Sequence, residues 1–149
     1  MLIYKDNIFI DPAINNRQEL FDLFNKKLFK KGFVKKGFYR ALIERERSYP
    51  TGLCVENINI ALPHTNPDMV IRETVAVATV KSPVSFGKMG DPDSTIGVSI
   101  IFLLLIKNKK AKFYHNLLNK IKNSDILHKI YESDNSQALC LLLIKLLNT

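Results

Sequence analysis

The chain has 149 residues, of which 46% are hydrophobic, and this size and apolar content predict a single compact domain over residues 1–149. Its longest apolar stretch, residues 96–106, is shorter than the ~20 residues of a membrane-spanning helix, and the N-terminus lacks the pattern of a secretory signal, so we expect a soluble, cytoplasmic protein that does not insert into a membrane. The net charge of +8 would suit nucleic acid or an acidic partner protein, but no RNA-recognition or zinc-finger pattern accompanies it, so we attribute the charge to a compositional bias of the source genome and expect no nucleic-acid partner.

The first half of the chain predicts two helices between short strands. Residues 8–10 form a short apolar strand, and Asn15 or Asn16 caps the helix that follows. Apolar residues recur in that helix at helical spacing until Gly32 ends it. A second helix is expected from about residue 36 to residue 47, and turn-forming residues then lead into another strand.

The second half predicts buried strands followed by helices. A β-branched strand covers residues 73–80 and is expected to stop at Ser82-Pro83. Residues 87–93 hold two glycines and a proline, which indicates a loop, and residues 96–106 form the most buried strand. Apolar spacing then predicts a helix from Ala111, a short segment over residues 125–131, and a final helix that starts at Asp134 or Ser136.

Helices therefore lie before, between and after strands that are apolar on both faces. A strand of this kind needs cover on both sides of its sheet. The sequence predicts an α/β layered domain in which a central mixed β-sheet is flanked by helices on both sides.

The stretch Ile58-Asn59-Ile60-Ala61-Leu62-Pro63-His64-Thr65 places a histidine at the end of a strand. Proline donates no backbone hydrogen bond to a sheet, so Pro63 ends the strand and His64 lies in the turn. An imidazole has an unperturbed pKa of roughly 6.5 and offers an uncharged ring nitrogen as a nucleophile near neutral pH. His64 is therefore a candidate nucleophile.

The sequence lacks the motifs of the common nucleotide, hydrolase and metalloprotease sites. His64, His115 and His128 lack ligand spacing with cysteines or carboxylates, so we expect neither a metal site nor a bound cofactor. A phosphoryl group that passes between two nucleophiles needs an aligned acceptor, and donors around its three equatorial oxygens. Arg45 suits the second task because its planar fork binds phosphate oxygens at two points, although a basic residue at the end of a helix also suits the helix dipole.

Further patterns accompany this histidine. The segment from Glu56 to His64 reads Glu-Asn-Ile-Asn-Ile-Ala-Leu-Pro-His, and Arg45-Glu46 and Thr51 precede it. On these motifs, and over nearly its whole length, the sequence resembles the enzyme IIA proteins of the fructose/mannitol superfamily in the bacterial phosphoenolpyruvate-dependent sugar phosphotransferase system. Residues 84–92 and the apolar strand after them are most similar to the galactitol-type branch.

The resemblance implies a type 2 EIIA domain with the mannitol/fructose-type IIA fold. His64 would accept a phosphoryl group from the phosphocarrier HPr and pass it to a cysteine of enzyme IIB, while the membrane subunit IIC imports a sugar or polyol such as galactitol. Arg45 would bind the phosphoryl oxygens, with Thr51 and Glu56 as supporting polar groups, and the transient phosphohistidine would need no cofactor. Mannitol-type members carry a second histidine at the start of a later helix. His115 is the candidate for that position, although an alignment of the leucines places Tyr114 there.

Three alternatives to a transport subunit remain. The same histidine chemistry serves IIA-like regulatory modules that bind partners according to their phosphorylation state. Cys54 would be the phosphorylated residue if the chain were a IIB subunit, but a IIB cysteine needs a loop of backbone amides, and Cys54 leads into an apolar strand. A basic nucleic-acid-binding domain would require salt-sensitive binding to DNA or RNA.

Overall fold

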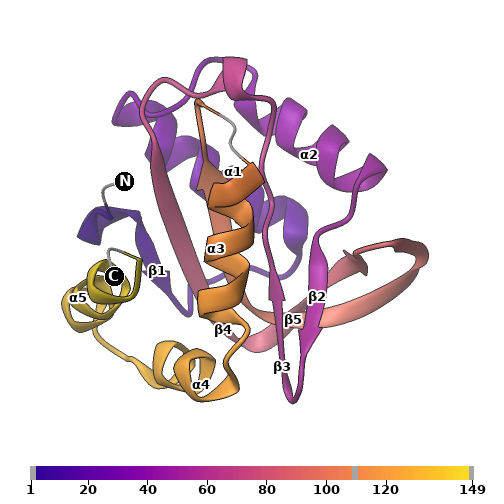
Figure 1. The fold of residues 1–149 in the computed structure, drawn as a ribbon. Helices are drawn as coiled ribbons and strands as arrows, with labels where there is room; N and C mark the ends of the chain where they lie inside the picture. Colours follow the sequence, from indigo (N-terminus) through magenta and orange to yellow (C-terminus); the bar gives the residue numbers. More distant parts are fainter. Residues whose placement is uncertain (1–2, 109–110, 148–149) are drawn as a thin grey trace.

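The computed structural model describes residues 3–108 and 111–147 (Figure 1). The strands are β1 (Ile8–Ile10), β2 (Gly52–Val55), β3 (Ile58–Ala61), β4 (Thr74–Lys88) and β5 (Asp91–Leu105). The α-helices are α1 (Arg17–Lys30), α2 (Phe38–Ser48), α3 (Ala111–Ile121), α4 (Ser124–Glu132) and α5 (Ser136–Leu147), and the 3₁₀ turns η1 and η2 cover Lys5–Asn7 and Pro67–Met69. In the described ranges, no helix combines the length and the apolar content that crossing a membrane requires.

The strands form one mixed, five-stranded sheet. β4 and β5 pair antiparallel over most of their length, β1 runs parallel to β4, and β3 runs parallel to β5. β2 pairs antiparallel with β3. The outer end of the β4–β5 hairpin curves back, so that Lys88 of β4 pairs with Gly52 of β2 (Figure 1).

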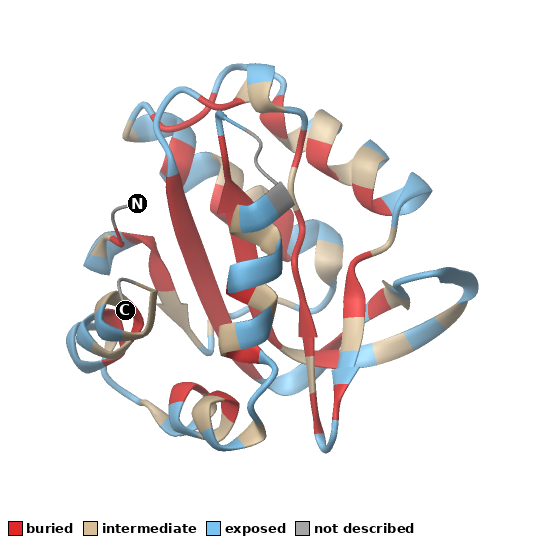
Figure 2. Cartoon of the chain, in the orientation of Figure 1, coloured by how far each residue is buried: buried red, intermediate tan, exposed pale blue. Residues whose placement is uncertain are grey.

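Helices cover both faces of this sheet, and Figure 2 shows buried strands between helices whose outer faces are exposed. On β5, Ile101 and Leu103 pack in the apolar cluster that α1 and α2 complete, whereas Phe102 and Leu104 pack in the cluster that α3, α4 and α5 complete. All four side chains are at most 1% exposed. Burial on both faces explains the uninterrupted apolar run, and the predicted α/β layered class is confirmed.

Local signals set the ends of the first two helices. Asn16 caps α1, since its side-chain oxygen accepts a hydrogen bond of 2.8 Å from the amide of Glu19. Gly32, with a φ of +78°, follows the end of α1. α2 begins at Phe38, later than predicted, because Gly37 holds a left-handed φ of +94° that cannot continue a helix.

The predicted strand end at Ser82-Pro83 and the predicted loop over residues 87–93 are both wrong. β4 continues through Ser82-Pro83, and the register shift between Thr79 and Val84 marks the irregularity that takes in the proline. The chain reverses in a two-residue turn, Met89-Gly90, with strand on either side. Gly90 supplies the positive φ, +78°, that such a turn requires.

Two glycines allow the tip of this hairpin to reach β2. A Cβ on Gly52 would lie 2.5 Å from the carbonyl oxygen of Gly87, and a Cβ on Gly87 would lie 2.8 Å from the Cβ of Pro50. The amide of Met89 then donates to the carbonyl of Gly52 at 2.7 Å. The absence of side chains at both glycines therefore fixes Met89 beside the start of β2.

Candidate active site

His64 lies at the rim of the sheet, shortly after β3 ends at Ala61. The amide of Leu104 in β5 donates to the carbonyl of Pro63 at 3.0 Å, and His64 forms an isolated parallel bridge with Leu104. Pro63 has no amide proton to offer the sheet, so its carbonyl provides the attachment. The turn is therefore held against β5, and the imidazole is half-buried.

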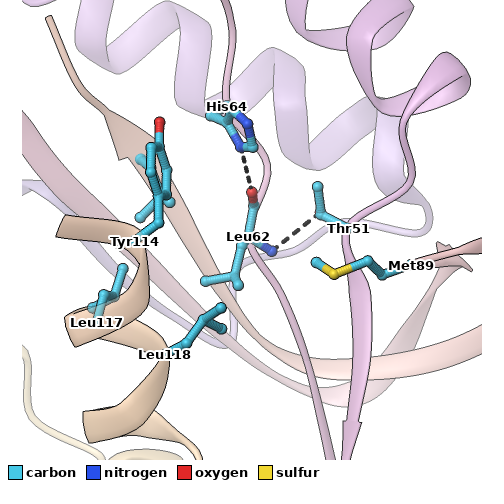
Figure 3. A pocket seen from close by; sticks show the side chains of 8 residues that line it. Thr51, Leu62, His64, Met89, Tyr114, Leu117 and Leu118 are labelled. Carbon is cyan, nitrogen blue, oxygen red and sulfur yellow. Dashed lines mark hydrogen bonds between the residues drawn. The ribbon is translucent and has the colours of Figure 1, made fainter. Parts of the chain in front are cut away.

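A backbone carbonyl orients the His64 ring. Nδ1 of His64 lies 2.8 Å from the carbonyl oxygen of Leu62 (Figure 3). A carbonyl oxygen only accepts hydrogen bonds, so Nδ1 carries the proton, and the lone pair of the neutral ring is on Nε2. Nε2 is therefore the ring atom that can attack an electrophile.

Leu62 is in turn held by Thr51. The amide of Leu62 donates to Oγ1 of Thr51 at 3.1 Å. The Thr51 hydroxyl donates to Oε1 of Glu46 at 2.8 Å, and the Thr51 amide donates to Oε2 of Glu46 at 2.7 Å. Both side chains are buried, so a chain of hydrogen bonds runs from α2 through Thr51 to the histidine turn.

The Glu46 carboxyl titrates near neutral pH. Burial raises its pKa to about 7, although the two hydrogen bonds from Thr51 and the charge of Arg17 act in the opposite direction. The side chain is 3% exposed, so the desolvation of the charge prevails. A shifted pKa beside a candidate nucleophile is typical of functional sites.

Arg45 reaches the site from the last turn of α2. Its guanidinium carbon lies 4.7 Å from the centroid of the Tyr49 ring, and Nη1 lies 3.5 Å from the side-chain oxygen of Asn66, next to the histidine turn. Nε of Arg45 is buried and has no hydrogen-bond partner within the described part of the chain. Burial raises the pKa of Tyr114, and the charge of Arg45 lowers it.

Helix α3 turns Tyr114, not His115, towards His64. The two ring centroids are 5.5 Å apart and the ring planes meet at 44°. Figure 3 shows the Tyr114 hydroxyl pointing away from α3, at the level of the imidazole. His115 is exposed, and its Nε2 lies 3.1 Å from Nδ2 of Asn119 on the same helix. Of the two candidates for the second position, the structure brings Tyr114 to the site.

A cavity of about 260 Å³ opens beside His64. Thr51, Met89 and Tyr114 line it (Figure 3). Four leucines form the rest of its wall: Leu62, Leu104, Leu117 and Leu118. Sequence analysis missed Met89 because residues 87–93 were predicted as a loop, and only the contact between the hairpin tip and β2 brings this side chain to the cavity.

The acidic side chain that contacts the site is Glu46, through Thr51, and not Glu56, which the sequence analysis named. Glu56 is exposed, with a φ of +52°, in the turn between β2 and β3, at the end of that hairpin opposite to Thr51 and His64. The structure therefore does not bring Glu56 to the site. Glu46 stands in the motif without a predicted role, but its spacing of one helical turn from the buried Leu42 could have revealed an acid on the apolar face of α2.

Over residues 3–108 and 111–147, no group of three His, Cys, Asp or Glu side chains is arranged to hold a metal ion. The site has instead an oriented imidazole and a phenol that line one cavity, and a guanidinium that contacts Asn66 next to the histidine turn. Residues 1–145 match the family model of the phosphoenolpyruvate-dependent sugar phosphotransferase system, EIIA 2. The chain belongs to the EIIA 2 family. It is therefore a component of a phosphotransferase system.

Relatives of this EIIA 2 chain differ in their roles. The PTS system galactitol-specific EIIA component of Escherichia coli (strain K12) is 26% identical over 135 residues, which cover 88% of this chain and 89% of the relative. The transcriptional regulator ManR of Bacillus subtilis (strain 168) is 25% identical over 114 residues, which cover 76% of this chain and 16% of the regulator.

The EIIA 2 fold of this chain also matches a solved structure. The complex of enzyme IIAMTL and phosphorylated enzyme IIBMTL from Escherichia coli gives a TM-score of 0.75 at 19% identity, over 98% of this chain and 96% of the matched chain. This likeness confirms the mannitol-type IIA fold that the sequence predicted.

Proposed function

We propose that the chain is a cytoplasmic phosphoryl carrier, in which Nε2 of His64 accepts a phosphoryl group from phospho-HPr and donates it to a cysteine of enzyme IIB. The observation that carries this proposal is the 2.8 Å hydrogen bond from Nδ1 of His64 to the Leu62 carbonyl, because it leaves the ring lone pair on Nε2. Membership of the EIIA 2 family supports the class of reaction.

Both transfer steps are displacements at phosphorus. In the first, the Nε2 lone pair of His64 attacks the phosphorus of the donor phosphohistidine, the donor P–N bond breaks, and its electron pair returns to the donor imidazole. The phosphorylated His64 ring keeps its Nδ1 proton, which the Leu62 carbonyl accepts as a hydrogen bond. In the second, a cysteine thiolate attacks the phosphorus, and the electron pair of the Nε2–P bond returns to Nε2.

Arg45 and Tyr114 would supply the donors around the phosphoryl oxygens. Nε of Arg45 lacks a hydrogen-bond partner among the residues described, and the planar guanidinium suits two phosphate oxygens at once. Burial raises the pKa of the Tyr114 hydroxyl, while Arg45 lowers it, so the hydroxyl keeps its proton at neutral pH and can donate. The proposed mechanism needs no cofactor beyond the transient phosphohistidine.

The relatives support particular partners and a substrate class. The likeness to a complex of IIAMTL with phosphorylated IIBMTL supports a IIB protein as the acceptor. The similarity to a galactitol-specific EIIA component supports galactitol or a related polyol, imported through a IIC subunit, as the substrate.

A labelling experiment tests this function. Purified protein mixed with phosphoenolpyruvate, enzyme I and HPr should take up one phosphoryl group in an acid-labile, alkali-stable bond. His64→Ala should abolish the label, whereas His128→Ala, a change at a histidine on α4 whose Nε2 lies 3.3 Å from the side-chain oxygen of Asn57, should keep it. Failure of the wild-type protein to label, or a label that survives His64→Ala, would refute the proposal.

A regulatory module that is not dedicated to transport is the second candidate, and the similarity to the regulator ManR favours it. The two functions differ in the fate of the phosphoryl group. A transport subunit passes its label to a purified galactitol-type or mannitol-type IIB within seconds to minutes, whereas a regulatory module keeps the label in their presence. Neighbouring genes that encode IIB and IIC subunits would also favour the transport function.

A further inference from the structure

An acidic side chain occupies the apolar face of α2. Phe38, Leu42 and Glu46 follow one another at intervals of four residues, and all three are buried. Ionisation of a buried carboxyl is costly, and a well-packed apolar residue often serves stability as well or better. Glu46 therefore calls for an explanation beyond packing, and its two hydrogen bonds to Thr51 indicate where to look.

We propose that Glu46, acting through Thr51, is a positioning residue whose ionised carboxylate fixes the tautomer and the orientation of His64. The inference deepens the proposed function: its effect on the rate of phosphoryl transfer rests on that function, whereas its effect on the His64 tautomer does not.

The ionised carboxylate gives the chain of hydrogen bonds a single direction. A carboxylate only accepts, so both the amide and the hydroxyl of Thr51 donate to Glu46. The Thr51 oxygen is then an acceptor for the amide of Leu62, and the carbonyl of the same leucine accepts from Nδ1 of His64. The charge on α2 thus helps to hold Leu62 in place, and the Leu62 carbonyl in turn selects Nδ1 of His64 as the protonated ring nitrogen.

Protonation of Glu46 reverses the hydrogen bond between its carboxyl and the Thr51 hydroxyl. A protonated carboxyl donates to the Thr51 oxygen, which must then accept from both this carboxyl and the amide of Leu62. The Thr51 hydroxyl then has no carboxylate acceptor, and its O–H bond turns towards the cavity that Thr51 lines beside His64. We expect a weaker hold on Leu62 and a mixture of the two His64 tautomers.

The surroundings of Glu46 leave both the ionised and the protonated form of its carboxyl accessible near neutral pH. Burial raises the pKa of the carboxyl to about 7, and the guanidinium of Arg17, from the start of α1, opposes this increase. On α2 itself, Arg45 and Arg47 flank Glu46 in sequence. Thr51 and Leu62, which complete the chain of hydrogen bonds, carry no charge.

The ¹⁵N chemical shifts of the His64 ring test the inference directly. In the wild-type protein at pH 8, Nδ1 should carry the proton in a single tautomer. Glu46→Gln, whose amide donates as the protonated acid would, and Thr51→Val should both give mixed tautomers. Thr51→Ser, which keeps the hydroxyl, and Glu44→Gln, a change at an exposed acid of the same helix, should behave as the wild type.

The rate of phosphoryl transfer from phospho-HPr gives a second readout. At pH 8, Glu46→Gln and Thr51→Val should each slow transfer on the order of tenfold, because the nucleophile is less well oriented. The double variant should be no slower than Thr51→Val alone, since Glu46 acts through that hydroxyl. A double variant whose loss of rate equals the product of the two single losses would overturn the inference.

A single Nδ1-protonated tautomer in both Glu46→Gln and Thr51→Val would overturn the inference even if His64 is phosphorylated normally. Failure of phosphorylation would refute the proposed function and leave the tautomer result intact. Should Glu46→Gln not fold, the wild-type protein decides: the ¹³C shift of the Glu46 carboxyl and the ¹⁵N shifts of His64 should share a titration step, and separate steps would overturn the proposal.

Discussion

The ring of Tyr114 stands 5.5 Å from the ring of His64, centroid to centroid, at a tilt of 44°. Burial raises the pKa of the Tyr114 hydroxyl and the nearby charge of Arg45 lowers it. The hydroxyl therefore remains a neutral donor across the pH range in which an imidazole would change its charge. Where the resembling mannitol-type proteins carry a second histidine, this chain presents a donor that does not titrate near neutral pH.

Tyr114→Phe removes this donor and keeps the ring that packs beside His64. We expect the rate of phosphoryl acceptance from phospho-HPr to fall on the order of tenfold, the loss that one hydrogen bond in the transition state represents. His115→Ala should change the rate by less than about twofold, because His115 is exposed and bonded to Asn119. A larger loss of rate in His115→Ala than in Tyr114→Phe would mean that His115, and not Tyr114, acts in the site.

Arg45→Gln should slow phosphoryl acceptance by about 10²-fold, because it removes the charged donor beside the developing phosphoryl charge. Arg45→Lys should give an intermediate loss, since it keeps the charge and loses the planar fork. Arg47→Gln is the matched control, at an exposed arginine in the same last turn of α2. Equal rates for Arg45→Gln and Arg47→Gln, measured with phospho-HPr, would contradict a role of Arg45 in the site.

The sequence predicted those parts of the fold that depend on local patterns. The apolar run of β5 and the Asn16 cap of α1 follow from periodicity and capping chemistry. The path of β4 through Pro83 could not be predicted, because a proline that ends a strand and a proline in a bulge have the same local pattern. The contact of the hairpin tip with β2 depends on two glycines far apart in sequence, Gly52 and Gly87.

The site was predictable to a similar degree. The motif pointed to His64, Arg45 and Thr51. In the structure His64 and Thr51 line one cavity, and Arg45 lies near the same turn through its contact with Asn66. Glu56 is nearer to His64 in sequence than Arg45 is, but a tight turn places it at the far end of the β2–β3 hairpin. Glu46 was overlooked because an acid is expected on a solvated face, and only packing shows that this one is buried.

The burial of Glu46 should make the stability of the protein depend on pH. Between the usual carboxyl pKa of 4.5 and about 7, the folded protein keeps a proton on Glu46 that the unfolded chain has released. The free energy of unfolding should therefore fall as the pH rises through this window, by about 3 kcal/mol from this group. Urea unfolding of Glu46→Gln should lack this decrease, whereas Glu44→Gln should retain it. Parallel pH profiles for the wild type and Glu46→Gln would show that the carboxyl has an ordinary pKa.

Gly52→Ala should separate the hairpin tip from β2. The added Cβ would lie 2.5 Å from the carbonyl oxygen of Gly87, and overpacking of this kind costs about 1 to 3 kcal/mol, or several degrees of Tm. The amide of Met89, which donates to the Gly52 carbonyl at 2.7 Å, should then exchange with solvent faster. Gly32→Ala is the control: it also lowers stability, because Gly32 has a φ of +78°, but it should leave the protection of the Met89 amide relative to global unfolding unchanged. Equal protection of Met89 in the two variants would mean that the hairpin tip does not depend on the close approach of Gly52 and Gly87.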